Sequence, residues 1–114
     1  MARNLFDPFE AVRHEWTPQV DVYRTPVGFV LKFDLAGVRL RDVTITVKGS
    51  VIRVSGVRRD RFVERGYRHH ALEISYSRFE REVRLPCLCE GAAMSTEYDE
   101  GMLIVNIELN RSDS

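Results

Sequence analysis

The amino-acid sequence predicts an all-β fold: an immunoglobulin-like antiparallel β-sandwich of seven to eight strands with a short N-terminal helix. Apolar and polar residues alternate through several short segments, and no helical pattern lies between these segments. Turn residues separate them about every 8–12 residues, which is typical of a sandwich. A chain of 114 residues fits one domain, which we expect over residues 16–109, after an arm at 1–15 and before a polar tail at 110–114.

A helix is expected only at the start of the chain, over residues 5–16. Asp7 is a suitable N-cap, Pro8 fits the first helical position, and Glu10 completes a capping box. Apolar residues then recur at helical spacing as far as Trp16. Because so short a helix is marginal alone in water, it needs a surface to pack against.

Strands are expected where the pattern alternates, since every second side chain of a strand lies on the same face. We expect Gly56 to end the fourth strand and Pro86 to end the fifth. In chain order the strands are residues 20–23, 29–35, 43–47, 51–55, 79–85, 94–98 and 102–109. The inward side chains of the second and last strands are Phe29, Leu31, Phe33, Leu35, Leu103, Val105, Ile107 and Leu109.

The segment between the fourth and fifth strands is unusually long. Residues 57–68 are charged and contain Gly66, which indicates a loop, and residues 69–75 are expected to form a further short strand at its far end.

The composition of the chain argues against several classes of function. With 17 basic and 17 acidic residues the formal net charge is zero, so no overall field attracts nucleic acid or an anionic membrane. No apolar run approaches the roughly 20 residues needed to cross a bilayer. The start of the chain lacks the apolar region of a signal peptide, and the two cysteines form no disulfide framework, so a reducing cytoplasm is expected.

Two clusters raise the question of a chemical site. Cys87 and Cys89 with His69 and His70 would supply four zinc ligands, but the C-x-C spacing is not the usual C-x₂-C. We therefore expect no metal and no cofactor. The motifs of phosphate-binding loops, zinc proteases and serine hydrolases are absent from the sequence, so an enzyme is not expected.

The second cluster is rich in arginine and aromatic residues, as nucleic-acid-binding surfaces are. Asp60 and Glu64 dilute its charge, which favours a solvated loop. The cluster consists of Arg58, Arg59, Arg61, Arg65 and Arg68 with Phe62 and Tyr67.

Arg81 is a charged residue at a position where its expected strand should carry an apolar one. Alternation places it on the apolar face, between Phe79 and Val83. Because a buried, unpaired charge costs several kcal/mol, the guanidinium must find a partner or reach an interface. The alternative is a stem packed among apolar residues with the head in water. We favour the interface.

Several segments, in order, carry a family resemblance: WTPQVDVY at 16–23, FDLAGV at 33–38, EISY at 73–76, FEREVRLP at 79–86 and YDEGML at 98–103. Together they resemble the small heat-shock protein (α-crystallin domain) family of bacteria and plants, and LFDPF at 5–9 resembles many of its N-termini. Ala36 replaces a proline of the family pattern, Thr96 an alanine and Ser77 a glycine.

The resemblance implies a dimer formed by strand exchange, in which the long loop pairs with the entry strand of a second copy. Such pairing would cover strand edges that otherwise favour aggregation. Arg81 would then face the second chain or a satisfied network. The implied dimer-interface residues are Val20, Asp21, Val22, His69, His70, Leu72, Glu73 and Arg81.

The resemblance also implies an ATP-independent holdase, a chaperone that binds partly unfolded client proteins before they aggregate. The implied client-binding arm contains Leu5, Phe6, Phe9 and Val12. Family members dock an I-x-I tail from a neighbouring subunit in a groove between two strands. Here that groove would be lined by Val43, Ile45, Val47, Met94, Thr96 and Tyr98.

The tail at 110–114 holds no I-x-I, and Ile107-Glu108-Leu109 belongs to the last strand by alternation. We therefore expect a dimer or small assembly with an open groove, although a larger homo-oligomer is a further possibility. The main alternative function is a monomeric co-chaperone-like sandwich that recruits one specific partner. A nucleic-acid binder acting through the arginine-rich loop is a third.

Overall fold

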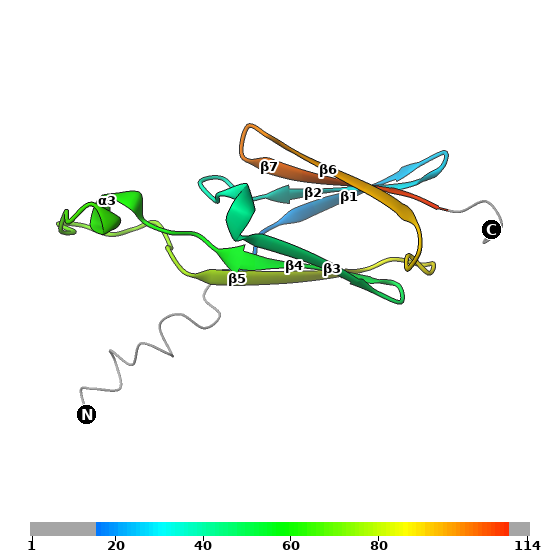
Figure 1. Ribbon diagram of the computed structural model, residues 1–114, viewed down its shortest axis with the longest axis horizontal. Coiled ribbons are helices and arrows are strands. Elements are labelled where there is room, and N and C mark those ends of the chain that lie inside the picture. Colours follow the sequence, from blue (N-terminus) through cyan, green and yellow to red (C-terminus); the bar gives the residue numbers. More distant parts are fainter. Residues whose placement is uncertain (1–15, 110–114) are drawn as a thin grey trace, which may run out of the picture.

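The computed structural model describes residues 16–109, which fold into two antiparallel β-sheets packed face to face (Figure 1). A sandwich forms because each sheet has one apolar face that must be covered. The predicted all-β sandwich is confirmed, and the described residues contain seven strands. Outside the described residues lie the tail at 110–114 and the arm, with most of its expected helix and the residues Leu5, Phe6, Phe9 and Val12.

The larger sheet has four strands in the order β1-β2-β7-β6. The hairpin between its last two strands turns through Glu100 and Gly101, whose φ angles of 50° and 81° are both positive. Two-residue hairpins favour this backbone because it matches the twist of the strands. The strands are β1 (Val20–Thr25), β2 (Gly28–Asp34), β6 (Ala93–Asp99) and β7 (Met102–Glu108).

The smaller sheet has three strands in the order β3-β4-β5. Its strands are β3 (Val43–Lys48), β4 (Val51–Val57) and β5 (Arg78–Arg84), and a single 3₁₀ turn, η1 (Leu40–Asp42), leads into β3. Gly56 does not end β4 as expected but lies inside it, opposite Val43 and Phe79. A Cβ at Gly56 would collide with the backbone carbonyl of Asp42, so glycine here permits a close approach of two backbones.

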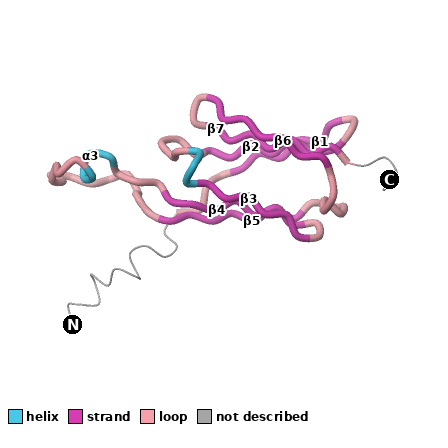
Figure 2. Tube along the Cα trace, in the orientation of Figure 1, coloured by secondary structure: helices cyan, strands magenta, loops and turns pink. Residues whose placement is uncertain are grey.

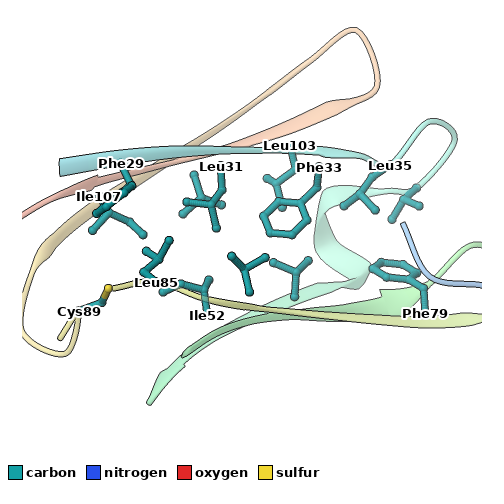
Figure 3. Close-up of a cluster of buried hydrophobic side chains, with 14 residues drawn as sticks. Phe29, Leu31, Phe33, Leu35, Ile52, Phe79, Leu85, Cys89, Leu103 and Ile107 are labelled. Atoms are coloured by element: carbon teal, nitrogen blue, oxygen red, sulfur yellow. The ribbon is translucent and has the colours of Figure 1, made fainter. Parts of the chain in front are cut away.

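The core lies between the two sheets (Figure 3). The predicted inward residues of β2 and β7 are buried, and Leu109 is half-buried against the same cluster. From the facing sheet come Ile52, Val54, Phe79 and Val83. Ile107 lies in β7 and is only 1% exposed, as predicted, whereas Leu109 follows the end of the strand and packs half-buried against the core.

The segment between β4 and β5 leaves the sandwich and projects beyond its end (Figures 1 and 2). It contains one short helix, α3 (Arg61–Glu64), which the sequence pattern did not predict. Residues 69–75 form no strand within the described chain, contrary to the expectation of a short strand at this point. A lone extended segment has no ladder to join unless another strand lies beside it.

Candidate functional site

The projecting loop, residues 58–77, exposes apolar side chains that the rest of residues 16–109 do not cover. Every residue from 61 to 76 is exposed. Phe62, Leu72 and Ile74 line an open hollow of about 350 Å³ within the loop. Contiguous exposed apolar surface on a folded domain is typical of an interaction site. The exposed apolar residues of the loop are Phe62 (57%), Val63 (41%), Tyr67 (59%), Leu72 (56%), Ile74 (57%) and Tyr76 (37%).

The projecting loop has internal order centred on Asp60. The Asp60 carboxylate caps α3, because one of its oxygens accepts from the amides of Phe62 and Val63 at 3.0 and 3.4 Å. Its other oxygen lies 2.8 Å from Nε2 of His69. The hydrogen bond with His69 and those with the two amides hold the pKa of the Asp60 carboxyl below its ordinary value. These bonds tie the start of the loop to its middle.

Arginines of the predicted nucleic-acid cluster are engaged at the base of the loop. Arg59 Nε lies 3.2 Å from the Asp42 carboxylate, and Arg58 donates to two backbone carbonyls. At the C-terminal end of α3, Glu64 lies 3.5 Å from Arg39. The loop therefore mixes paired charges with apolar residues instead of presenting a continuous basic surface, which weakens the nucleic-acid hypothesis.

The predicted entry-strand residues lie on β1, which is an edge strand of the larger sheet. Val20 packs against the core, and Asp21 is exposed. Val22 pairs with the buried Leu31 of β2 yet remains 44% exposed. The candidate partners from the loop, His69, His70, Leu72 and Glu73, are all exposed. Exposed apolar side chains on an edge strand are suited to pairing with another chain.

Arg81 lies on the inner face of β5, as alternation predicted, opposite Val54 in the register. The side chain is half-buried, and its Nη1 donates a hydrogen bond of 3.1 Å to the backbone carbonyl of Pro18. Pro18 belongs to the entry segment just before β1. Within the described chain the guanidinium thus reaches a backbone acceptor, which accounts for an arginine on an apolar face.

The six predicted groove residues form two rows on two edge strands, β3 and β6. The β3 row is half-buried and packs against the core, whereas the β6 row is more open, with Met94 42% exposed. The first row is Val43, Ile45 and Val47, and the second is Met94, Thr96 and Tyr98. Alternation places each row on one face of its strand.

Hydrogen bonds near both ends of β6 attach it to other elements, to the β3–β4 turn at one end and to the residue after β2 at the other. Gly49 lies just beyond the end of β3, and its carbonyl accepts from the amide of Cys89 at 2.9 Å. The Gly49 amide donates to the carboxylate of Glu90, a residue just before β6, at 2.8 Å. Near the end of β6, the Tyr98 hydroxyl donates to the Leu35 carbonyl at 2.8 Å, in the connection that leads towards β3. Burial raises the pKa of the Tyr98 hydroxyl, so it remains a donor.

The four candidate zinc ligands are not brought together. Cys87 and Cys89 lie at the end of the sandwich beside the β3–β4 turn, whereas His69 and His70 lie on the loop that projects from the opposite end (Figure 1). Among residues 16–109, no group of three His, Cys, Asp or Glu side chains is arranged to hold a metal ion. In the same part of the chain, no helix is long and apolar enough to cross a membrane.

The family model described as "Hsp20/alpha crystallin family" matches residues 21–114, which include both sheets, the projecting loop and the two edge strands. The chain belongs to the Hsp20/alpha crystallin family. The predicted family resemblance is thereby confirmed, and membership supports a chaperone role. Members of this family are ATP-independent chaperones rather than enzymes.

Relatives of the Hsp20 chain occur in bacteria and plants. It is 30% identical to Spore protein SP21 of Stigmatella aurantiaca over 112 residues, covering 90% of this chain and 66% of that protein. It is 23% identical to Small heat shock protein C2 of Rickettsia felis, covering 91% of this chain and 74% of that protein. For the 22.7 kDa class IV heat shock protein of Pisum sativum the identity is 29%, and the chain spans about half (54%) of it.

Solved structures establish that the Hsp20 chain shares the fold. HSP18.5 from E. histolytica superposes with a TM-score of 0.69 at 24% identity, covering 83% of this chain and 89% of that one. The hspA protein from Xanthomonas axonopodis gives a TM-score of 0.68 at 23% identity, covering 84% and 96%. At these identities the likeness is one of fold, and the roles of individual residues must be argued from this chain.

Proposed function

We propose that this protein is an ATP-independent holdase, which binds partly unfolded client proteins and keeps them from aggregating in the cytoplasm. The observation that carries the proposal is the pair of largely apolar rows on β3 and β6, which are edge strands of the two facing sheets. Unfolding proteins expose apolar segments in extended conformation. An edge strand offers such a segment backbone hydrogen bonds, and a neighbouring apolar row offers it a place to bury side chains.

Family membership supports the same function, because the Hsp20 family consists of chaperones. Neither nucleic acid nor a membrane is part of the proposal. The formal net charge of the chain is zero, and the arginines at the base of the projecting loop have partners within the chain. The arm residues Leu5, Phe6, Phe9 and Val12 remain proposed client contacts from their apolar character alone.

A light-scattering assay with a heat-labile enzyme tests the holdase proposal. We expect the protein to suppress scattering in the absence of ATP, and to do so in proportion to its molar ratio to the client. Serum albumin at the same mass concentration serves as the control for crowding. If scattering is unchanged at several-fold molar excess of this protein, the holdase proposal fails.

We further propose that the holdase is a homodimer formed by strand exchange, with the projecting loop of each copy pairing with β1 of the other. Three features support this proposal: the loop projects away from its own sandwich (Figure 2), its apolar side chains are exposed, and β1 is an edge strand. Leu72 and Ile74 would meet Val20 and Val22 across the contact. Such pairing would cover apolar surface that a monomer leaves in water.

Sedimentation analysis of a paired substitution tests the dimer. Because Leu72 and Ile74 are exposed in the single chain, Leu72→Ser with Ile74→Ser should leave the monomer fold intact while abolishing dimerisation. Leu88→Ser is the matched control, since Leu88 is 69% exposed on the connection between β5 and β6 and should leave the dimer unchanged. A wild-type protein that is a stable monomer would instead favour the co-chaperone-like alternative.

A further inference from the structure

Arg58 joins three separate parts of the chain at the base of the projecting loop. Its Nε donates to the Ser75 carbonyl at 2.9 Å, and its Nη1 donates to the Ala36 carbonyl at 3.0 Å. The centre of the guanidinium lies 3.8 Å from the centroid of the Trp16 ring. The part of the loop that returns to β5 (Ser75), the turn after β2 (Ala36) and the entry segment (Trp16) therefore meet at one side chain.

The chemistry of this contact suits arginine alone. The planar guanidinium can donate from two edges while its face stacks on an indole, whereas a lysine ammonium is a single point charge. The Arg58 amide also donates to the Ser77 carbonyl at 3.0 Å. The side chain and the backbone amide of Arg58 thus bind Ser75 and Ser77, in the part of the loop that returns to β5. These bonds close the base of the loop.

Beyond this base, the loop has few restraints from the sandwich. Residues 61–76 are all exposed, and the Asp60–His69 contact ties the loop only to itself. A loop with so little buried surface would otherwise sample many directions. Its direction therefore depends on the contacts at its base, those of Arg58 together with the ion pairs Arg59–Asp42 and Arg39–Glu64.

We propose that Arg58 is the positioning residue of the projecting loop: it locks the loop to the entry segment at Trp16, so that the loop is held ready to pair with a second chain. The consequence for dimerisation rests on the proposed strand exchange, whereas the locking itself does not. Holding a binding segment in its bound orientation reduces the entropy lost on association. The same contact links the loop to the point where the arm enters the domain.

The test compares Arg58→Ala and Arg58→Lys with two controls. Arg61→Ala removes the same charge from an exposed site three residues away, and Ile52→Val weakens the core without touching the loop. The dimer dissociation constant is measured by sedimentation for each variant, with the unfolding midpoint measured alongside. Trp16 is the only tryptophan, so its emission and its quenching by acrylamide report the stack directly.

We expect Arg58→Ala to raise the dimer dissociation constant by at least about fivefold, a typical lower bound for coupling between sites. Trp16 should become more accessible to acrylamide, and Arg58→Lys should recover only part of the loss. Ile52→Val should lower the unfolding midpoint with an unchanged dissociation constant. If Arg58→Ala changes the dissociation constant no more than Ile52→Val or Arg61→Ala does, the positioning role is wrong.

If the wild-type protein does not dimerise at any concentration, strand exchange fails but the positioning role is still tested. Amide hydrogen exchange then measures the base of the loop, where the Arg58 amide donates to Ser77. Faster exchange at this amide in Arg58→Lys, together with increased quenching of Trp16, supports the proposal that Arg58 holds the loop to the entry segment. Exchange and quenching equal to those of the wild type overturn it.

Discussion

The guanidinium of Arg81 and the backbone carbonyl of Pro18, which lie 63 residues apart in the chain, are joined by a hydrogen bond of 3.1 Å. The bond links the inner face of β5 to the segment that leads into β1, and so it connects the two sheets of the sandwich. It gives a half-buried charge a partner that keeps it inside the fold.

Replacement of Arg81 by alanine should therefore lower stability. A hydrogen bond to a charged group contributes about 1.5–3 kcal/mol, so we expect the free energy of unfolding to fall by about that amount. Arg84→Ala is the matched control, since Arg84 lies on the same strand with its side chain exposed on the opposite face. Urea unfolding measures both, and equal losses in the two variants would contradict the role given to the Pro18 contact.

Substitution of Gly56 by alanine should be costly, because the added methyl group meets the Asp42 carbonyl and the Phe79 ring. Forcing extra atoms into a packed site costs about 1–3 kcal/mol. Ser55→Ala, at the adjacent position, should change the free energy of unfolding by about 0.5 kcal/mol or less. The unfolding midpoints of the two variants provide the comparison, and a neutral Gly56→Ala would show that the two backbones can separate freely.

Cys89 should react with thiol reagents far more slowly than Cys87. Cys89 is 4% exposed, and burial, with a smaller effect of Cys87, raises the pKa of its thiol. Less thiolate is then present at pH 8, and the reagent cannot reach the sulfur. Mass spectrometry of the native protein after brief alkylation should show modification at Cys87 first. Both thiols should react together in denaturant, and comparable native rates would indicate that this end of the core opens readily.

The Asp60 cap of α3 should be lost in acid. Because the folded-state pKa of this carboxyl lies below its ordinary value, its contribution is present above that value and disappears as pH falls through the lowered pKa. The amide resonances of Phe62 and Val63, which donate to this carboxylate, should report the transition in an NMR titration. The Asp60→Asn substitution should weaken this pH-dependent transition, whereas the Glu73→Gln substitution, in the same loop, should leave the transition in place.

The open row on β6 should be needed for client binding if the holdase proposal is correct. Met94→Lys places a charge on the face that Thr96 and Tyr98 share, so the molar ratio needed to suppress aggregation should rise several-fold. Ser95→Lys adds the same charge to the opposite face of the strand and is the matched control. Equal chaperone activity of the two variants would exclude this row as a client surface.

The sequence alone determined the sandwich. Alternation identified the seven strands and the inward residues of β2 and β7, because a period of two places every second side chain on one face whatever lies opposite. It also placed Arg81 on the inner face of β5. Motif order was sufficient to indicate the family, since it depends on local spacing and not on contacts.

Only the tertiary structure determined which other residues these side chains and backbone segments contact. Arg58 looked like one arginine of a solvated charged cluster, and no pattern indicated that it would join Trp16 to Ala36 and Ser75, because its partners are a ring and two backbone carbonyls distant in sequence. Gly56 read as the end of a strand, since the close approach of the Asp42 backbone has no local signal. Contacts between distant segments arise from the packing of whole elements, and alternation along one strand carries no information about them.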